Sequence, residues 1–331
     1  MSGNARVRPA KKVVVSTTIN PPTEAIERFD SLPDWELVVV GDAKTPKDYR
    51  LRRGVYLPLE EQMKMDPHLS ELIGHNCIQR RNFGFLIAHR MGADIVATVD
   101  DDNIPYEGWG QGLLIESAAV KARQYTPSDG VALCFDPVHF TNYPHLWHRG
   151  FPIDRLRERG RYRNERVETR FDIQADFWDG DPDIDAICRM EHSPECSFDP
   201  ACFPMSTTVF SPFNSQNTFL RREVLPHYFM LPHVGRMDDI WAGYLVEAMG
   251  FRVVYQRPSV RQQRNPHNLL KDFENESLGY LRTSAFLEGL RGANPLLALQ
   301  RLVPERTFAA YLAYRKHFPE RGEARNSRLT S

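Results

Sequence analysis

Short apolar runs alternate with amphipathic stretches over the first hundred residues. Residues 95–99 carry apolar side chains on both faces in a run too short for a helix, which predicts a buried strand. Apolar residues recur at helical spacing over 69–91, and Gly92 ends this predicted helix. Further strands are predicted at 12–18, 36–40 and 55–57, and a short helix at 23–29 with Thr23 as its N-cap. The alternation indicates an α/β protein with a doubly wound sheet.

The pattern loosens after Gln111. Residues 136–185 are dense in proline, glycine, aromatic and charged side chains, which is typical of long loops with short strands. The chain is predicted to be mostly helical over 268–318, with breaks near Pro295 and Pro304. We also expect extended segments at 130–135, 207–210, 218–220 and 252–255, and a helix at 240–249 with Asp238 as its N-cap.

Three consecutive carboxylates, Asp100 to Asp102, follow the predicted strand at 95–99. Ligands bind at the carboxyl ends of strands in an open α/β sheet. Adjacent carboxylates repel each other, and a cation among them lowers that cost. In an extended chain Asp100 and Asp102 point to the same side, so both can face one Mg²⁺ or Mn²⁺ ion that carries a phosphate-containing substrate. The alternative is a solvated acidic turn.

Polar side chains also follow the first two predicted strands. Thr17, Thr18 and Ile19 end the first strand, and Asp42 follows the second. In a parallel sheet both ends lie on the same rim as the carboxylate triplet, where hydroxyls and a carboxylate could hold a base and a ribose. Ordinary turn chemistry, with Asp42 capping a loop, explains the same residues without a ligand.

A second acidic centre lies at Asp238 and Asp239. Helix capping and the helix dipole explain both residues structurally, but if this helix start faces the rim, one carboxylate could accept a proton from an acceptor. Arg80 and Arg81 cannot share one helix face, so we expect one in solvent while the other reaches a phosphate or carboxylate. His267 could close a metal or diphosphate site, although a lone histidine is more often a surface residue.

Composition and charge narrow the function classes. The net charge of -1 and a pI near 6.8 give no electrostatic case for nucleic acid or an anionic membrane as partner. The five cysteines form no CxxC pair, which argues against a zinc site or a disulfide framework and for a reducing compartment. We expect a cytoplasmic protein, because the polar start carries no secretory signal and no apolar run reaches membrane-spanning length.

The motifs together resemble a known family. The strand followed by three aspartates is similar to the DXD motif of GT-A fold glycosyltransferases, which hold manganese or magnesium on a nucleotide-sugar diphosphate. More narrowly, the chain resembles the reversibly glycosylated polypeptide, or UDP-arabinopyranose mutase, family and still more closely the STELLO-type glycosyltransferases. The matching segments keep their order over about 12–280 and are 16–19, 40–46, 81–84, 99–103, 149–152, 178–186, 213–218, 236–241 and 264–267.

The resemblance implies a GT-A fold, which is α/β with a mostly parallel central sheet and C-terminal helices. It implies a metal held by Asp100 and Asp102, with His267 as a further candidate ligand. It places the nucleotide at a set of residues comprising Thr17, Thr18, Ile19, Asp42, Arg81, Asp100 and Asp101.

Arg149 falls at the self-glycosylated arginine of the mutase family. Two interpretations stay open here: Arg149 accepts a sugar, or it contacts the donor, and we favour donor contact because a guanidinium suits a diphosphate. The chain departs from the mutases by one extra residue after Pro152 and by Val260-Arg261 in place of their His-Ser. These departures favour transfer to another acceptor over ring isomerisation.

The leading hypothesis is a glycosyltransferase that depends on Mn²⁺ or Mg²⁺ and uses a nucleotide-sugar donor, with UDP favoured as the nucleotide. Asp239 is preferred over Asp238 as the group that contacts or deprotonates an unidentified acceptor. The alternatives are a UDP-sugar mutase or self-glycosylating protein, and a nucleotide-binding scaffold without turnover. We expect a glycosyltransferase domain at 12–280, a helical extension at 281–320 and flexible ends at 1–11 and 321–331; a homo-oligomer stays open.

Overall fold

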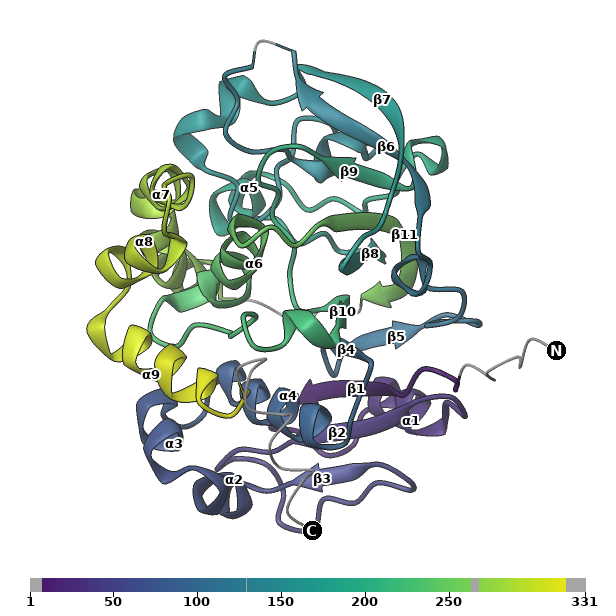
Figure 1. Ribbon diagram of the computed structural model, residues 1–331, viewed down its shortest axis with the longest axis vertical. Helices are drawn as coiled ribbons and strands as arrows, with labels where there is room; N and C mark the ends of the chain where they lie inside the picture. Colours follow the sequence, from purple (N-terminus) through teal and green to yellow (C-terminus); the bar gives the residue numbers. More distant parts are fainter. Residues whose placement is uncertain (1–7, 129, 263–267, 320–331) are drawn as a thin grey trace, which may run out of the picture.

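The computed structural model describes residues 8–128, 130–262 and 268–319. One large sheet forms the centre of this part of the chain (Figure 1). Its strands follow the order β3-β2-β1-β4-β10-β8-β11-β9-β6-β7, and β5 pairs with β11. The strands are β1 (Lys12–Thr17), β2 (Glu36–Val40), β3 (Val55–Leu57), β4 (Ile95–Val99), β5 (Asn103–Pro105), β6 (Val120–Pro127), β7 (Tyr162–Thr169), β8 (Ile173–Gly180), β9 (Met205–Thr207), β10 (Asn217–Arg221) and β11 (Val253–Gln262).

The directions of the strands bring several strand ends to one edge of the sheet, which we call the rim. From β3 to β11 along the sheet, every strand runs the same way except β10, which is antiparallel to both β4 and β8. The predicted α/β class with a mostly parallel central sheet is confirmed. Because Asn217 pairs with Val99, β10 begins beside the end of β4. The ends of β1, β2 and β4 and the start of β10 therefore lie at one edge, where α/β sheets bind ligands.

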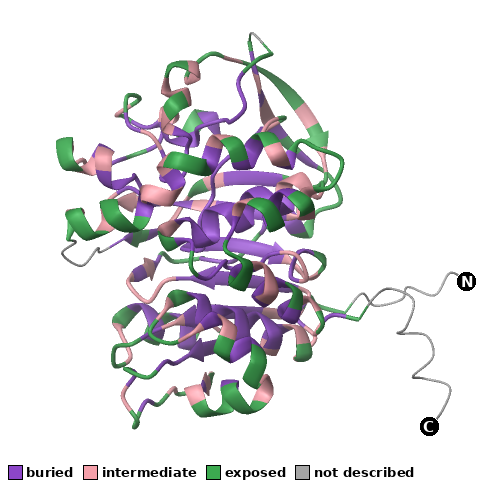
Figure 2. Cartoon of the chain, turned by 90° about the vertical axis from the view of Figure 1, so that its left-hand side faces the viewer, coloured by how far each residue is buried: buried purple, intermediate pink, exposed green. Residues whose placement is uncertain are grey.

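Helices and short turns pack around this sheet. Buried residues concentrate in the strands and on the inner sides of the helices, and exposed residues lie outside (Figure 2). The helices are α1 (Glu24–Ser31), α2 (Leu59–Met65), α3 (Pro67–Ile73), α4 (Arg81–Arg90), α5 (Ala186–Glu191), α6 (Asp238–Ala248), α7 (Leu269–Leu290), α8 (Pro295–Leu302) and α9 (Glu305–Arg315). Two 3₁₀ turns matter for the site, η1 (Ile78–Arg80) and η7 (Gly235–Met237).

Continuous apolar runs predicted the N-terminal strands well. The bounds of β2, β3 and β4 match the prediction, and all five residues of β4 are buried. Thr23 is the N-cap of α1, and its hydroxyl accepts a hydrogen bond from the Ile26 N–H at 3.3 Å. The strand expected at 130–135 is wrong, since this segment contributes only an isolated bridge between Cys134 and Phe210. Strands β5 and β6 went unpredicted, and β7 and β8 lie in the segment 136–185, for which long loops with short strands were expected.

The single long helix expected over 69–91 is also wrong. Helix α3 ends at Ile73, and Gly74 and Asn76 take positive φ angles of 87° and 55° before η1 and α4 begin. A right-handed helix cannot continue through such angles, because they belong to the left-handed region. After the break, Gln79 and Arg81 reach the rim of the sheet, where they bind Asp238 and Asp100.

The C-terminal helices return to the N-terminal half of the molecule, where α9 packs along α3 (Figure 1). Thr307 donates to the Pro232 carbonyl at 2.6 Å, and the buried Tyr314 hydroxyl donates to the Leu225 carbonyl at 2.9 Å. Residue 280, the expected end of the glycosyltransferase domain, lies inside α7. Across the described ranges, none of the helices combines the length and apolar character that crossing a membrane requires.

Candidate active site

A pocket of about 180 Å³ lies between the end of β4, the start of β10 and the start of α6. It joins the two acidic centres predicted from the sequence. Larger cavities of about 730 and 400 Å³ are lined by other residues and contain none of the predicted site residues. The small pocket is lined by Ile78, Asp100, Asp102, Arg149, Asp183, Ser215, Gln216, Arg236, Asp238, Asp239 and Gln262.

Arg81 ties the first strand to the carboxylate triplet. Its Nη2 donates to Asp100 Oδ1 at 2.7 Å and to Thr17 Oγ1 at 3.1 Å, and its Nη1 donates to the Ser215 carbonyl at 2.9 Å. Burial raises the pKa of Asp100, and the positive charge of Arg81 opposes that rise. Arg81 thus holds the carboxylate that begins the triplet in a fixed position.

The expectation that one of the two arginines faces solvent is wrong, because Arg80 and Arg81 are both buried. Arg80 points the other way from Arg81, where its Nε donates to Gln62 Oε1 at 2.7 Å and its Nη1 to Ser70 Oγ at 2.9 Å. Arg81 is satisfied by segments distant in sequence, such as Ser215, and Arg80 by Gln62 and Ser70, which the break after α3 brings beside it; a single helix over 69–91 predicted neither arrangement.

The remaining predicted nucleotide residues are not among those that line the pocket. Thr18 Oγ1 donates to Asp101 Oδ2 at 2.5 Å, which fixes the middle carboxylate of the triplet. Both carboxylate oxygens of Asp42 accept backbone N–H groups, from Ala43 at 2.7 Å and from Cys77 at 3.0 Å. These bonds match the loop-capping interpretation of Asp42, while the side chain of Ile19 is exposed.

The predicted N-cap role of Asp238 is wrong. Met237 is the N-cap residue, because η7 runs directly into α6 and gives Asp238 helical angles of -55° and -52°. An N-cap needs extended angles to turn its side chain back onto the first helical N–H groups. The Asp238 carboxylate instead lines the pocket and accepts a hydrogen bond from Gln79 Nε2 at 2.8 Å. Burial, together with the neighbouring charge of Asp239, raises the pKa of Asp238 to about 7.

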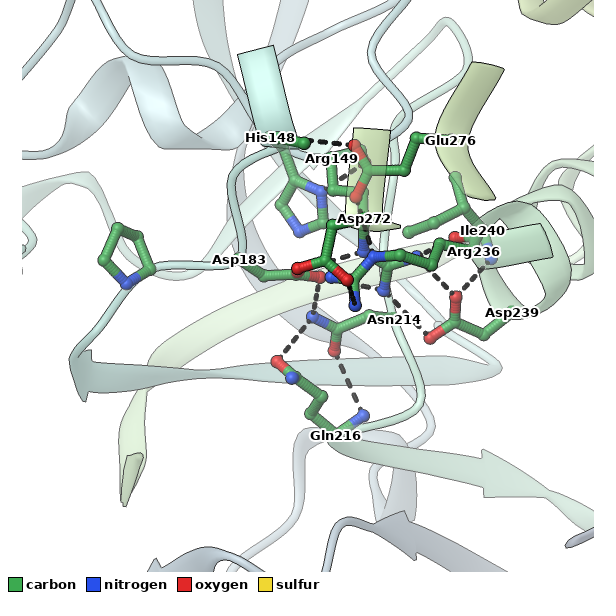
Figure 3. A network of polar contacts seen from close by, with 12 residues as sticks. His148, Arg149, Asp183, Asn214, Gln216, Arg236, Asp239, Ile240, Asp272 and Glu276 are labelled. Carbon is green, nitrogen blue, oxygen red and sulfur yellow. Dashed lines mark hydrogen bonds and ion pairs between the residues drawn. The ribbon is translucent and has the colours of Figure 1, made fainter. Parts of the chain in front are cut away.

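Asp239 is engaged by the protein itself (Figure 3). Its Oδ2 accepts the Ser215 N–H at 2.9 Å and Arg149 Nη2 at 3.3 Å, and its Oδ1 accepts Arg149 Nη1 at 3.1 Å. Arg149 also donates from Nε and Nη2 to the two oxygens of Asp183, each at 3.0 Å, and from Nη1 to the Arg236 carbonyl. Burial alone would lower the pKa of Arg149, but Asp183 and Asp239 raise it well above its usual value.

The donor set suits a hard divalent cation that is completed by substrate oxygens. Asp100 and Asp102 line the same pocket, and Mg²⁺ or Mn²⁺ is commonly held by one or two carboxylates plus phosphate. Within the described ranges, no group of three or more His, Cys, Asp or Glu side chains is arranged to hold a metal. The third predicted ligand, His267, lies outside the described residues.

Sequence reasoning missed several residues of the pocket. Gln79 lies in the unpredicted turn η1, so no periodicity marked it. Asp183, Ser215 and Gln216 fall within segments that carried the family resemblance, but no individual role was assigned to them. Their shared signal is chemical: each supplies polar atoms immediately before a helix or strand at the rim, as Ser215 and Gln216 do before β10.

No family model matches the chain. The chain is similar to two plant STELLO proteins. It is 26% identical over 280 residues to the Arabidopsis thaliana protein named "Probable glycosyltransferase STELLO2", and 24% identical over 289 residues to "Probable glycosyltransferase STELLO1". The alignments cover 76% and 78% of this chain but 35% and 36% of the plant proteins. The chain thus spans about a third of the length of these curated relatives.

Solved structures of glucosyl-3-phosphoglycerate synthase from Mycobacterium tuberculosis are also similar. One, in complex with Mn²⁺, UDP-glucose and phosphoglyceric acid, superimposes with a TM-score of 0.45 at 14% identity, covering 86% of this chain and 82% of that chain. Another with the same ligands gives a TM-score of 0.46 at 13% identity, covering 83% and 80% of the two chains.

Proposed function

We propose that this chain is a glycosyltransferase that uses a nucleotide-sugar donor, with UDP as the nucleotide. The observation that carries the proposal is the meeting of two acidic centres, Asp100 with Asp102 and Asp238, in one small pocket at the rim of the sheet. The similarity to proteins named glycosyltransferases supports it. One centre suits a donor diphosphate, and the other suits an acceptor hydroxyl.

On the donor side, Asp100 and Asp102 would hold Mn²⁺ or Mg²⁺, which when bound neutralises the charge of a departing diphosphate. Arg81 keeps Asp100 in place through the contact at 2.7 Å. Thr17, through Arg81, and Thr18, through Asp101, connect the end of β1 to the same triplet. The nucleotide therefore belongs along the ends of β1 and β4.

On the acceptor side, we assign proton acceptance to Asp238. The acceptor oxygen forms the new bond to the anomeric carbon, the bond from that carbon to the diphosphate oxygen breaks, and the hydroxyl proton passes to Asp238. A general base works best with a pKa near the working pH, and that of Asp238 is raised to about 7. Asp239, which the sequence alone favoured, already binds Arg149 and Ser215.

Arg149 acts in this proposal as a positioning residue. It is 6% exposed, and its contacts to Asp183 and Asp239 hold the start of α6 against the loop that contains Asp183. A direct contact with the donor, or attachment of a sugar, would first require breaking these contacts. The geometry therefore favours a role in aligning Asp238 and Asp239.

The test is incubation of the protein with a panel of UDP-sugars and Mn²⁺ in the absence of an acceptor, followed by chromatography of nucleotides and sugars. Slow release of UDP with free sugar is expected, because water then takes the place of the acceptor. Asp102→Asn should lower this release strongly, whereas Asp34→Asn, at an exposed acid remote from the triplet in sequence, should not. Conversion to ring isomers would identify a mutase, and binding without turnover would identify a scaffold.

A further inference from the structure

The pocket is strongly anionic. Five carboxyl groups but only two guanidinium groups occur among the described residues that line it. A bound Mn²⁺ or Mg²⁺ would offset the two charges of Asp100 and Asp102, and the donor diphosphate would then add negative charge of its own. Asp183, Asp238 and Asp239 remain on the acceptor side. Whether the acceptor can be an anion then depends on the two arginines.

Arg149 has no N–H group left for a ligand. A guanidinium carries five N–H donors, and the hydrogen bonds of Arg149 account for all five. Nε binds Asp183, Nη1 binds Asp239 and the Arg236 carbonyl, and Nη2 binds Asp183 and Asp239. Figure 3 shows this guanidinium enclosed by its partners. Two carboxylates already balance its single charge, so it offers an incoming anion no net attraction.

Arg236 is committed to carboxylates of α7. Its Nε donates to Glu276 Oε1 at 2.7 Å, and its Nη1 reaches Asp272 Oδ1 at 3.5 Å (Figure 3). Glu276 is almost fully buried and also accepts the Ala186 N–H at 2.8 Å, so its position is fixed by the fold. An anion in the pocket would have to compete with two acids for this guanidinium.

The other lining residues are uncharged. Gln216 and Gln262 bring amide groups to the pocket, and Ile78 adds an apolar side chain that is 40% exposed. The Ser215 hydroxyl also lines the pocket but already donates to Asp239 Oδ2 at 3.1 Å. Hydroxyl and amide groups both donate and accept hydrogen bonds, so they match the hydroxyls of a polyol or sugar. A phosphate or carboxylate, in contrast, would face like charges, and among the described lining residues both guanidinium groups already pair with carboxylates, so such juxtaposition disfavours binding.

We infer that the acceptor presents an uncharged hydroxyl-bearing group, such as a neutral sugar or polyol, and that phosphorylated or carboxylated acceptors are excluded from this pocket. The inference rests on the proposed function and deepens it by naming the class of acceptor. It is carried by the paired state of Arg149, which binds Asp183 and Asp239, and of Arg236, which binds Asp272 and Glu276.

A pair of small acceptors that differ by one phosphate provides the test. The full chain is incubated with Mn²⁺ and the UDP-sugar that it hydrolyses fastest, and with either glycerol or glycerol 3-phosphate as the probe. Glycosylated probe and free sugar are both quantified by mass spectrometry. We expect transfer to glycerol to exceed transfer to glycerol 3-phosphate by at least about tenfold at equal concentration, which corresponds to about 1.4 kcal/mol.

Equal transfer to both probes, a preference for the phosphate, or transfer to neither would overturn the inference. Loss of donor hydrolysis without any probe would instead contradict the proposed function, so the two failures are distinguishable. Releasing Arg236 supplies a second test: Asp272→Asn combined with Glu276→Gln should shift the ratio severalfold toward glycerol 3-phosphate. The control is Glu288→Gln on the same helix. The exposed Glu288 carboxylate pairs with Arg155 at 2.6 Å, and its removal should leave the ratio unchanged.

Discussion

Two neighbouring aspartates at the start of α6 have different surroundings, and therefore respond differently to substitution. Asp238 accepts a hydrogen bond from Gln79 and faces the pocket, whereas Asp239 binds Arg149 and Ser215. Desolvation works against the ionised form of Asp238, while the guanidinium of Arg149 gives Asp239 a direct counter-charge. In the proposed function, Asp238 is therefore the reacting carboxylate and Asp239 the one that anchors Arg149.

Asp238→Asn should separate activity from stability. Loss of the base should lower kcat by about 10²–10⁴-fold. The pKa of Asp238 is raised from 3.8 in the unfolded chain to about 7 in the fold. Protonation of Asp238 therefore contributes to the free energy of unfolding fully below pH 3.8, and this contribution is lost as pH rises through 7. The variant should therefore gain stability over the wild type between pH 4 and pH 8, on the order of a few kcal/mol at about 1.36 kcal/mol per pKa unit.

Chemical denaturation at pH 5 and pH 8, with turnover measured in parallel, checks this expectation. Asp239→Asn supplies the comparison, since it leaves buried Arg149 with one carboxylate fewer and should lose roughly 3–5 kcal/mol of stability. Near-normal turnover of a folded Asp238→Asn protein would show that another group accepts the proton.

Gln79→Leu should change the pH profile of the reaction. The amide N–H of Gln79 stabilises the ionised form of Asp238, so its removal raises the pKa of that carboxyl further. Hydrogen bonds to charged groups contribute about 1.5–3 kcal/mol, which corresponds to a shift of about one to two pH units. The acid limb of kcat/KM against pH should move upward by that amount. Gln111→Leu, at an exposed glutamine, is the control, and an unmoved limb in Gln79→Leu would contradict the proposal.

At the scale of elements, local patterns predicted strands better than helix ends. Strand β4 is a continuous apolar run buried on both faces, and a run this short and apolar rarely forms anything other than a buried strand. The helix over 69–91 failed because the apolar spacing continues through Gly74 and Asn76, whose backbone angles break the helix. The cap at Asp238 failed because η7 supplies a preceding turn, and the sequence carries no separate signal for it.

Substitutions in helix α9 test how much the C-terminal helices contribute to the free energy of unfolding. Tyr314 is fully buried and donates to the Leu225 carbonyl, whereas Leu312 on the same helix is 44% exposed. Tyr314→Ala should destabilise by roughly 3–5 kcal/mol, as large aromatic-to-alanine changes in cores do. Leu312→Ala should cost about 0.5 kcal/mol or less. Urea unfolding of the two variants decides this, and similar midpoints would show that α9 contributes little to the fold.

At the scale of the whole molecule, the site assembles from segments that sequence alone could not bring together. The carboxylate triplet and the aspartates of α6 were recognisable as chemistry, because their types and positions after predicted elements were visible. Their shared pocket was not, since it requires β10 to insert beside β4 and bring Ser215 and Gln216 to the rim. The buried state of Arg149 likewise depends on Asp183 and Asp239, which lie 34 and 90 residues away in sequence.

Ligand binding should raise the stability of the entire chain. A ligand that binds only the folded state at a hundred times its Kd adds about 2.7 kcal/mol to the free energy of unfolding. UDP with Mn²⁺ should therefore raise the thermal midpoint, and a chelator or Asp102→Asn should remove most of that rise. A rise of equal size with UDP and chelator together would show that the nucleotide binds without a metal.

The turn at residues 78–81 also predicts an uneven tolerance to mutation. Ile78 is 40% exposed, whereas Gln79, Arg80 and Arg81 are buried and bind three different parts of the fold: Asp238, the Gln62 and Ser70 side chains, and Asp100. In a library in which each of the four positions is randomised and screened for activity, Ile78 should accept many residues and each of the next three very few. Adjacent positions would then differ sharply in the number of different residues that they tolerate.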